Sequence, residues 1–295
     1  GQVLYLAPDS ESYLNPMDLD LSTDVGESPM LMQADFLLSQ CELMMASYGN
    51  PLMPIEKSLI DRCISLVYRD YLKRPTPENM PILGDLYQCL RAQDNHTADD
   101  LATAMEIYVT GSLSYLNHRT NVDLNNRLVC YNTSKMGQGL KKLVMANVQK
   151  HIWQRTTINR YAGVTTRIFL DEFHMLLKEP QTAAYTAEIY KRFRKWNGIP
   201  TSLTQNVKDL LASPEIENIL ENSDFILMLN QGASDRGILA QRLGISPQEL
   251  THVTNSGEGE GLLFFGDKII PFVDKFPRDT QLYRVMTTKP SDLAA

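Results

Sequence analysis

The sequence predicts an α/β protein that carries an additional, purely helical region. From about residue 137 onward, apolar segments of strand length alternate with helical segments, a pattern typical of a mainly parallel sheet. Near the end of the chain, residues 261–265 and 268–273 flank Gly266-Asp267, which predicts an antiparallel hairpin at one edge of that sheet. Between residues 28 and 120, apolar residues recur at helical spacing, so that region is expected to be all-helical.

Composition excludes several classes of protein. The chain has 295 residues, of which 43% are hydrophobic and 21% charged, and a net charge of -7. These values exclude a disordered or collagen-like chain, and the four scattered cysteines do not form a disulfide framework. Apolar runs fall far short of the roughly 20 residues of a membrane span, and we expect no export leader. The first basic residue is Lys57, so a broad nucleic-acid-binding face is not expected.

The first part of the chain should begin with a strand and continue with helices. Residues 2–6 are interpreted as a buried strand, and Pro16 breaks the loop that follows. A helix over residues 29–48 should stop at Gly49, and a second, over residues 55–73, should have Pro54 in its first turn. Thr97 and Asp100 resemble a capping box that opens a helix toward residue 116, with a weak point at Gly111.

The second part should alternate helices and strands. We expect a helix over residues 140–154, with Lys141, Lys142 and Lys150 on its solvent face. The elements that follow are a strand at 167–172, a helix at 179–197 capped by Gly198, strands at 202–204 and 224–230, and a short helix opened by Ser246 and Glu249.

Asp171 and Glu172 are the sharpest chemical feature. They follow three apolar residues, and parallel sheets bind ligands at the carboxyl ends of their strands. In nucleotide hydrolases the first acid orients Mg²⁺, usually through water, and the second polarises the water that attacks the γ-phosphate. The alternative is a buried strand that ends in a solvated acidic turn.

Three further polar residues have two interpretations each. Gln205 follows the next predicted strand, where an amide can sense a terminal phosphate or simply hydrogen-bond a loop. Arg192 and Arg194 lie at the carboxyl end of a helix. They can complement the helix dipole, and they can also act on a phosphate bound by a neighbouring subunit.

The phosphate-binding loop of nucleotide hydrolases is missing from the sequence. No GxxxxGK[ST] motif occurs, and residues 137–141 (GQGLK) have the wrong spacing and no following Ser or Thr. There is no GxSxG elbow for serine catalysis either.

Together, these segments resemble the VirB-type motor ATPases of bacterial conjugation and type IV secretion, the family of the fourth VirB component and of TraE- and TraC-like proteins. The matching segments, in the family's order, are residues 1–6 (GQVLYL), 14–18 (LNPMD), 168–172 (IFLDE), 190–199 (YKRFRKWNGI), 204–211 (TQNVKDLL) and 259–266 (GEGLLFFG). The resemblance spans nearly the whole chain.

The resemblance implies a RecA-like P-loop NTPase core, formed by residues 1–24 and 125–295, with an all-helical insertion at residues 25–124. Asp171 and Glu172 would be the Walker B pair, with Asp171 on Mg²⁺ through water. Gln205 would be the phosphate sensor that contacts the nucleotide, and Arg192 and Arg194 the arginines acting in trans. Because the family's phosphate loop lies upstream of the first strand, we expect a carboxyl-terminal fragment, inactive alone, with no ATP or Mg²⁺ bound.

The resemblance also implies a setting. The full-length protein is expected to be an ATPase that forms a hexameric ring. Its expected partners are other secretion-channel and coupling proteins, at the cytoplasmic face of the bacterial membrane. Two other interpretations remain. One is a non-enzymatic scaffold protein of the same machinery, and the other is metal-dependent hydrolysis on Asp171, Glu172 and His174. Residues along one strand alternate faces, which disfavours the metal site.

Overall fold

The computed structural model describes residues 1–21, 28–45, 51–178, 180–205 and 207–289. The chain divides into two units, Gly1–Leu203 and Thr204–Ala295, which are treated separately below. Among the described residues, no helix combines the length and apolar character that crossing a bilayer requires.

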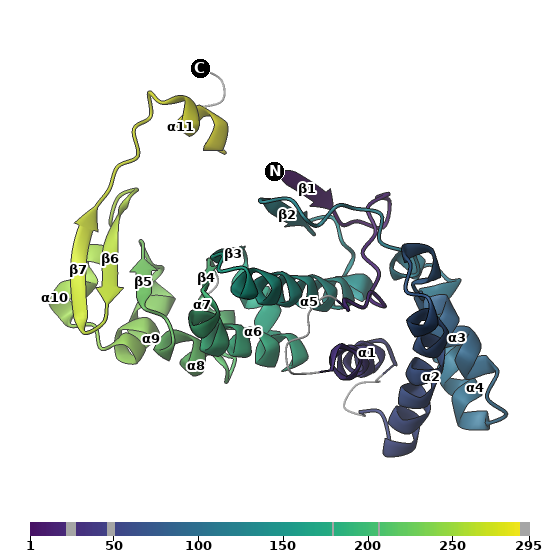
Figure 1. The fold of residues 1–295 in the computed structure, drawn as a ribbon. Coiled ribbons are helices and arrows are strands. Elements are labelled where there is room, and N and C mark those ends of the chain that lie inside the picture. The colour runs from purple at the N-terminus through teal and green to yellow at the C-terminus, as the bar shows by residue number, and fades with distance from the viewer. Residues whose placement is uncertain (22–27, 46–50, 179, 206, 290–295) are drawn as a thin grey trace. The chain divides into compact units, whose positions relative to one another are not determined.

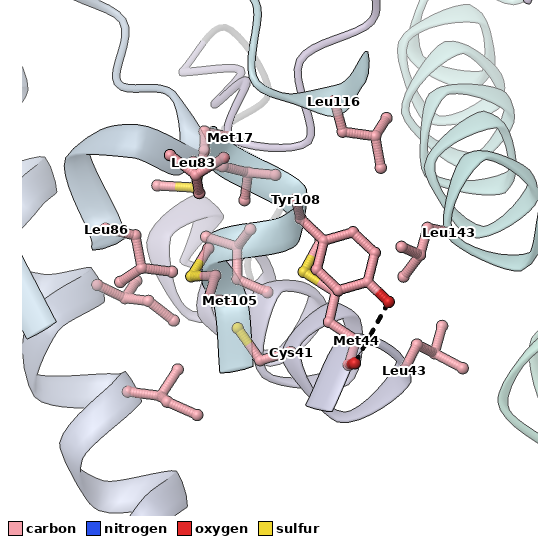
Figure 2. Close-up of a cluster of buried hydrophobic side chains, with 14 of the residues drawn as sticks. Met17, Cys41, Leu43, Met44, Leu83, Leu86, Met105, Tyr108, Leu116 and Leu143 are labelled. Carbon is pink, nitrogen blue, oxygen red and sulfur yellow. Dashed lines mark hydrogen bonds between the residues drawn. The ribbon is translucent and has the colours of Figure 1, made fainter. Parts of the chain in front are cut away.

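The first unit contains the all-helical region that the apolar spacing predicts. Its helices are α1 (Pro29–Met45), α2 (Pro54–Lys73), η1 (Pro77–Asn79), α3 (Leu83–Arg91), α4 (His96–Val109) and η2 (Ser114–Leu116). Helices α2, α3 and α4 pack as neighbours (Figure 1). Their shared core includes side chains from α1, α3 and α4, and Leu143 of α5 reaches the same cluster (Figure 2). Tyr108 donates a hydrogen bond of 3.4 Å to the Met44 carbonyl within this core.

Two short parallel strands lie on either side of the helical region in the sequence. Strand β1 (Gln2–Tyr5) pairs with β2 (Val129–Asn132), with Gln2 opposite Val129 and Tyr5 opposite Asn132. The prediction of a buried first strand was wrong in part, because Leu4 is buried while Val3 and Tyr5 are 49% and 59% exposed. The helices α1 to α4 therefore lie, in the sequence, between two strands that pair with each other.

Helix α5 (Gln138–Tyr161) connects the two parts of the first unit. Leu140, Leu143 and Val148 belong to the core of the helical region. Further along α5, Ile152 and Trp153 pack against a second cluster, formed by strand β3 and helix α6. One continuous helix therefore contributes to the helical core and to the α/β layer.

The second cluster positions a pair of parallel strands. The elements are β3 (Thr166–Leu170), η3 (Phe173–Leu177), α6 (Pro180–Phe193), η4 (Arg194–Trp196) and β4 (Gly198–Ser202). Strands β3 and β4 are parallel, with Thr166 opposite Gly198 and Leu170 opposite Ser202. Ile168 packs with Phe193 in the small core beneath them.

The second unit is built around an antiparallel sheet. Its elements are α7 (Val207–Leu211), α8 (Ile216–Glu221), β5 (Phe225–Met228), α9 (Ala233–Leu243), α10 (Pro247–Leu250), η5 (Thr251–Val253), β6 (Glu260–Phe265), β7 (Lys268–Val273) and α11 (Gln281–Met286). The strand order is β5-β6-β7. The hairpin prediction is confirmed, with Gly266 at a φ of 59° in the turn, and so is the capping box, in which Ser246 Oγ accepts from Glu249 N.

Several predicted boundaries differ from the structure. Asn95, and not Thr97, caps α4, since its side chain accepts from Ala98 N, and α4 ends at Val109 before reaching Gly111. The predicted strand at 202–204 lies too late, because β4 ends at Ser202. The predicted stop at Gly49 and start at residue 179 lie outside the described residues.

Gly261 provides a stability prediction in the second unit. A Cβ atom at this position of β6 would lie 2.2 Å from the Met228 carbonyl oxygen of the neighbouring strand. We expect Gly261→Ala to lower the free energy of unfolding by about 1–3 kcal/mol, because backbone atoms of a sheet cannot move aside cheaply. Thermal unfolding followed by circular dichroism would measure the change.

Gly237 supplies the matched control for this substitution. It lies inside α9, and a Cβ there would meet nothing within 4 Å. Gly237→Ala should be neutral or stabilise by up to about 1 kcal/mol, because alanine loses less backbone freedom in a helix. Equal destabilisation by both substitutions would contradict the packing argument.

Candidate active site

The two predicted acids follow the end of strand β3. Thr166–Leu170 form the strand. Ile168 within it is only 7% exposed, because it packs against Ile189 and Phe193 of α6. Asp171 and Glu172 come directly after Leu170, and both side chains are exposed. The prediction of a buried strand is wrong in part, because only Ile168 is buried while Phe169 is 69% exposed. The two carboxylates nevertheless follow the carboxyl end of a parallel strand, where parallel sheets bind ligands.

The backbone at Glu172 is held in a left-handed conformation. Its φ is 46° and its ψ is 44°, which is uncommon for a residue other than glycine and costs on the order of 1–3 kcal/mol. The Glu172 amide donates to Asp171 Oδ1 at 2.9 Å, and Met175 N donates to the Glu172 carbonyl at 2.9 Å. The turn is therefore fixed from both sides, and the cost of its conformation is offset by these contacts.

Strand β4 extends this support past the end of the regular pairing. Leu203 N donates to the Leu170 carbonyl at 2.9 Å, and Phe173 N donates to the Leu203 carbonyl at the same distance. The Asp171-Glu172 turn is thus enclosed between two hydrogen bonds from its flanking residues to the segment that follows β4.

The structure brings His174 to Glu172, which the sequence argument did not expect. His174 Nδ1 lies 3.3 Å from Glu172 Oε2. The alternation of faces along a strand does not apply here, because β3 ends at Leu170 and the chain turns at Glu172 into the 3₁₀ helix η3. Even so, no group of three metal-ligating side chains occurs among the residues the structure describes.

Gln205 follows strand β4 along the chain. The parallel register places Leu170 opposite Ser202, so the carboxyl ends of β3 and β4 lie at the same edge of their sheet. Gln205 comes three residues after Ser202 and belongs to the second unit. Asn206 lies outside the described residues.

The two candidate arginines differ in their surroundings. Arg192, in the last turn of α6, donates from Nε to Glu188 Oε1, and its guanidinium lies 5.8 Å from the centre of the Trp153 ring. Arg194 opens η4 and is exposed. The structure therefore places Arg192 in contacts within its own unit.

The turn after these arginines corrects the predicted helix cap. Asn197 takes the left-handed conformation with a φ of 56°, so it ends the helical segment in place of Gly198. Gly198 instead begins β4, where a Cβ would lie 3.0 Å from Phe193 side-chain atoms. This close approach favours glycine, because a Cβ there would require the Phe193 side chain to shift, and it brings β4 directly against the end of α6.

Lys150 is the residue that the sequence misplaced most clearly. It was expected on the solvent face of its helix, yet it is 8% exposed. Its Nζ donates to the carbonyls of Pro16, at 3.0 Å, and Asp18, at 2.6 Å, and lies 4.7 Å from the centre of the Phe36 ring. Burial lowers the pKa of this ammonium to about 7, although the nearby Asp18 carboxylate opposes the shift.

Asp18 has the complementary environment in the same loop. Burial raises the pKa of its carboxyl, an effect opposed by a hydrogen bond from Thr120 and by Lys150. Asn15 is fully buried and donates to the Pro81 carbonyl at 2.7 Å. The Asn15-Pro16-Met17-Asp18 motif is thus a junction between α5 and the helical region. In the sequence, Pro16 indicated only that this segment is irregular, and not that it contacts α5.

An acidic pair after one parallel strand, with a polar segment after its neighbour, is an arrangement found in P-loop NTPases, and comparisons with known proteins place the chain in that class of folds. A family model of the TraG P-loop domain matches residues 85–256, which is more than half of the chain. The chain belongs to this family.

Solved structures show the same fold. VirB4 of Thermoanaerobacter pseudethanolicus is 24% identical, with a TM-score of 0.79, and the match covers 94% of this chain and 77% of that one. The plasmid coupling protein TrwB, in complex with the non-hydrolysable GTP analogue GDPNP, is 11% identical with a TM-score of 0.55, and the match covers 94% and 76% of the two chains. No curated protein sequence matches the chain.

Proposed function

We propose that this chain is part of an ATPase that energises a conjugative or type IV secretion channel, for channel assembly or substrate transfer. The Asp171-Glu172 pair at the end of β3 carries the proposal, in a member of the TraG P-loop domain family. The names of its structural relatives, VirB4 and a conjugative coupling protein that binds a GTP analogue, support the same setting.

Each predicted site residue has a role in this proposal. Glu172 polarises the water that attacks the terminal phosphate, and Gln205 senses that phosphate. Arg192 and Arg194 are both candidates for a neighbouring subunit's site. Arg192 already contacts Glu188 and Trp153 within its own unit, so a role in trans would require it to exchange these contacts.

Asp171 suits Mg²⁺, which binds oxygen ligands and commonly takes only one or two protein carboxylates while keeping several waters. Its carboxylate is exposed at a strand end, and one of its oxygens already accepts the Glu172 amide, so its direction is fixed. Mg²⁺ bound there would neutralise charge that develops on the transferring phosphate.

We also propose that residues 1–24 and 125–295 form the RecA-like core and residues 25–124 an insertion. The parallel pairing of β1 with β2 supports this, because the helical region lies between these two strands in the sequence. This division differs from the two units Gly1–Leu203 and Thr204–Ala295, because those units group residues by their contacts in space and not by their order in the sequence.

The proposal is tested by nucleotide binding and hydrolysis. The 295 residues contain no GxxxxGK[ST] motif, so we propose that a longer protein supplies the residues that hold the nucleotide. That protein should hydrolyse ATP with Mg²⁺, whereas the 295-residue chain should show no ATP binding in calorimetry. Micromolar affinity in the short chain would contradict the second expectation.

If the longer protein lacks both a phosphate loop and ATP hydrolysis, the alternative of a non-enzymatic scaffold is correct. For the active protein we propose a hexameric ring of identical subunits. Channel and coupling proteins would hold this ring at the cytoplasmic face of the membrane. The mass of the purified longer protein in solution, with and without ATP, tests the ring.

A further inference from the structure

We propose that His174 is a positioning residue that holds the Glu172 carboxylate in its working direction. This inference rests on the proposed function, because it assigns Glu172 the role of polarising the attacking water. The observation that carries it is the distance of 3.3 Å between His174 Nδ1 and Glu172 Oε2.

The two side chains differ in burial in the way this role requires. The His174 side chain is 10% exposed, whereas the Glu172 side chain is 50% exposed. A glutamate open to water would otherwise sample many rotamers, and ordering such a side chain costs up to about 2 kcal/mol. A buried ring beside one carboxylate oxygen restricts that freedom, and the other oxygen takes no part in this contact.

The 3₁₀ helix η3, which carries His174, is fixed by packing and by hydrogen bonds. Its neighbours in η3, Phe173 and Leu176, are 2% and 4% exposed. Phe173 N donates to the Leu203 carbonyl, and Thr182 Oγ1 of α6 donates to the Leu176 carbonyl at 2.6 Å. The 3₁₀ helix that carries His174 is therefore held by hydrogen bonds to Leu203, which follows β4, and to Thr182 of α6, independently of the Glu172 side chain.

The left-handed backbone at Glu172 explains why this contact can form. With β3 ended at Leu170, the turn at a φ of 46° leads directly into η3, and the side chains of residues 172 and 174 meet. Residues that stay in strained conformations cluster at functional sites, where the strain sets the direction of a side chain. Here the strained turn and the buried histidine act on the same carboxylate.

The chemistry of the contact is that of a donor orienting a base. An imidazole with its proton on Nδ1 donates to Glu172 Oε2 and adds no full charge beside the carboxylate. Glu172 then remains able to accept a hydrogen bond from the attacking water through its second oxygen. Loss of the partners that orient ligands at metal sites typically costs about 10- to 100-fold in affinity or activity, and we expect a loss of that order here.

The test uses the longer protein that hydrolyses ATP, with three substitutions of His174. In His174→Asn the amide nitrogen takes roughly the place of Nδ1 and can donate, whereas His174→Leu has similar size and His174→Ala small size, both without a donor. We expect His174→Leu and His174→Ala to lower kcat about 10- to 100-fold with KM for ATP unchanged, and His174→Asn to keep most of kcat.

A double substitution separates positioning from a general structural effect. In a Glu172→Gln background, His174→Leu should change the residual turnover less than twofold, because two residues that act as a unit are not additive. Equal losses in the Asn and Leu variants, a raised KM for ATP, or a full additional loss in the double variant would each overturn the inference.

The outcomes also distinguish this inference from the proposed function. If the longer protein hydrolyses no ATP, the proposed function fails and the positioning role with it. If it hydrolyses ATP but Glu172→Gln turns over like the wild type, the assignment of Glu172 and the positioning role fail, while the proposed ATPase function stands. If Glu172→Gln is inactive while His174→Leu retains full kcat, only the positioning role fails. Circular dichroism melting curves of each variant check that the loss is not one of folding.

Discussion

Replacing Glu172 with glutamine is expected to lower ATP turnover of the longer, hydrolysing protein by about 10²- to 10⁴-fold, the usual contribution of a positioned acid or base. Glutamine has the shape of glutamate but cannot accept the proton of the attacking water. Because the substitution leaves Asp171 and its contact with the Glu172 backbone amide in place, affinity for ATP should stay within about threefold. Phosphate release gives kcat, and calorimetry gives the dissociation constant.

A second glutamate provides the control for the loss of charge. Glu221, the last residue of α8, is exposed and undergoes the same chemical change in Glu221→Gln. That variant should keep wild-type turnover, since surface substitutions rarely change stability by more than about 0.5 kcal/mol. Wild-type turnover in Glu172→Gln would refute the assignment of Glu172.

Local signals were sufficient where the structure depends on neighbours in sequence. Pro54 does occupy the first turn of α2, and Ser246 with Glu249 does form a capping box. Gly266 lies in the turn of the β6-β7 hairpin at a positive φ. Each of these features is decided by the conformations available to a few adjacent residues, so the sequence alone predicted them.

Features that depend on distant partners were missed or misplaced. Strand β2 (Val129–Asn132) has four residues and no distinctive pattern, and it exists because β1, more than a hundred residues earlier, pairs with it. Lys150 follows the periodicity of a solvent-facing residue, yet the carbonyls of Pro16 and Asp18 surround its ammonium group. No spacing rule within α5 contains that information.

The candidate site shows the same division. The order of an apolar strand and two acids singled out Asp171 and Glu172 as candidates, because that pattern is local, and their roles stay a prediction. The contact of His174 with Glu172 was not predicted, since it depends on the strand ending at Leu170 and on a left-handed residue directly after Asp171. Whether the predicted roles of Gln205, Arg192 and Arg194 are correct stays a prediction for the experiments above.

Lys150→Ala is expected to lower the free energy of unfolding by about 1–3 kcal/mol. The substitution removes the Lys150 donor from the partly buried Asp18 carbonyl, and an unsatisfied group of this kind costs about 1–3 kcal/mol. The Pro16 carbonyl loses one of two donors, since Gln33 Nε2 still donates to it at 2.9 Å. It also removes the contact with the Phe36 ring. Both tryptophans, Trp153 and Trp196, lie in the first unit with Lys150, so their fluorescence during denaturation in urea measures the change.

Lys142→Ala is the control for loss of a lysine from the same helix. Lys142 is partly exposed, and alanine is the better helix former, so its free energy of unfolding should stay within about 0.5 kcal/mol of the wild type. If both variants unfold at the same urea concentration as the wild type, the junction between α5 and the Asn15–Asp18 loop contributes little.

The pH dependence gives a sharper test of the buried ammonium. Burial lowers the pKa of Lys150 to about 7 in the folded chain from an ordinary 10.5, so between these values the unfolded chain binds one proton more. Stability from this group therefore rises with pH across that window, by up to ~1.4 kcal/mol per pH unit, and is lost as the pH falls toward 7. Between pH 7.5 and 9.5 the free energy of unfolding of the wild type should therefore rise relative to that of Lys150→Ala. Tyrosines and cysteines titrate in both proteins, so their contributions cancel in this difference. Parallel curves over this range would show that the Lys150 amine stays protonated in the fold, and that Asp18 compensates its charge more strongly than burial opposes it.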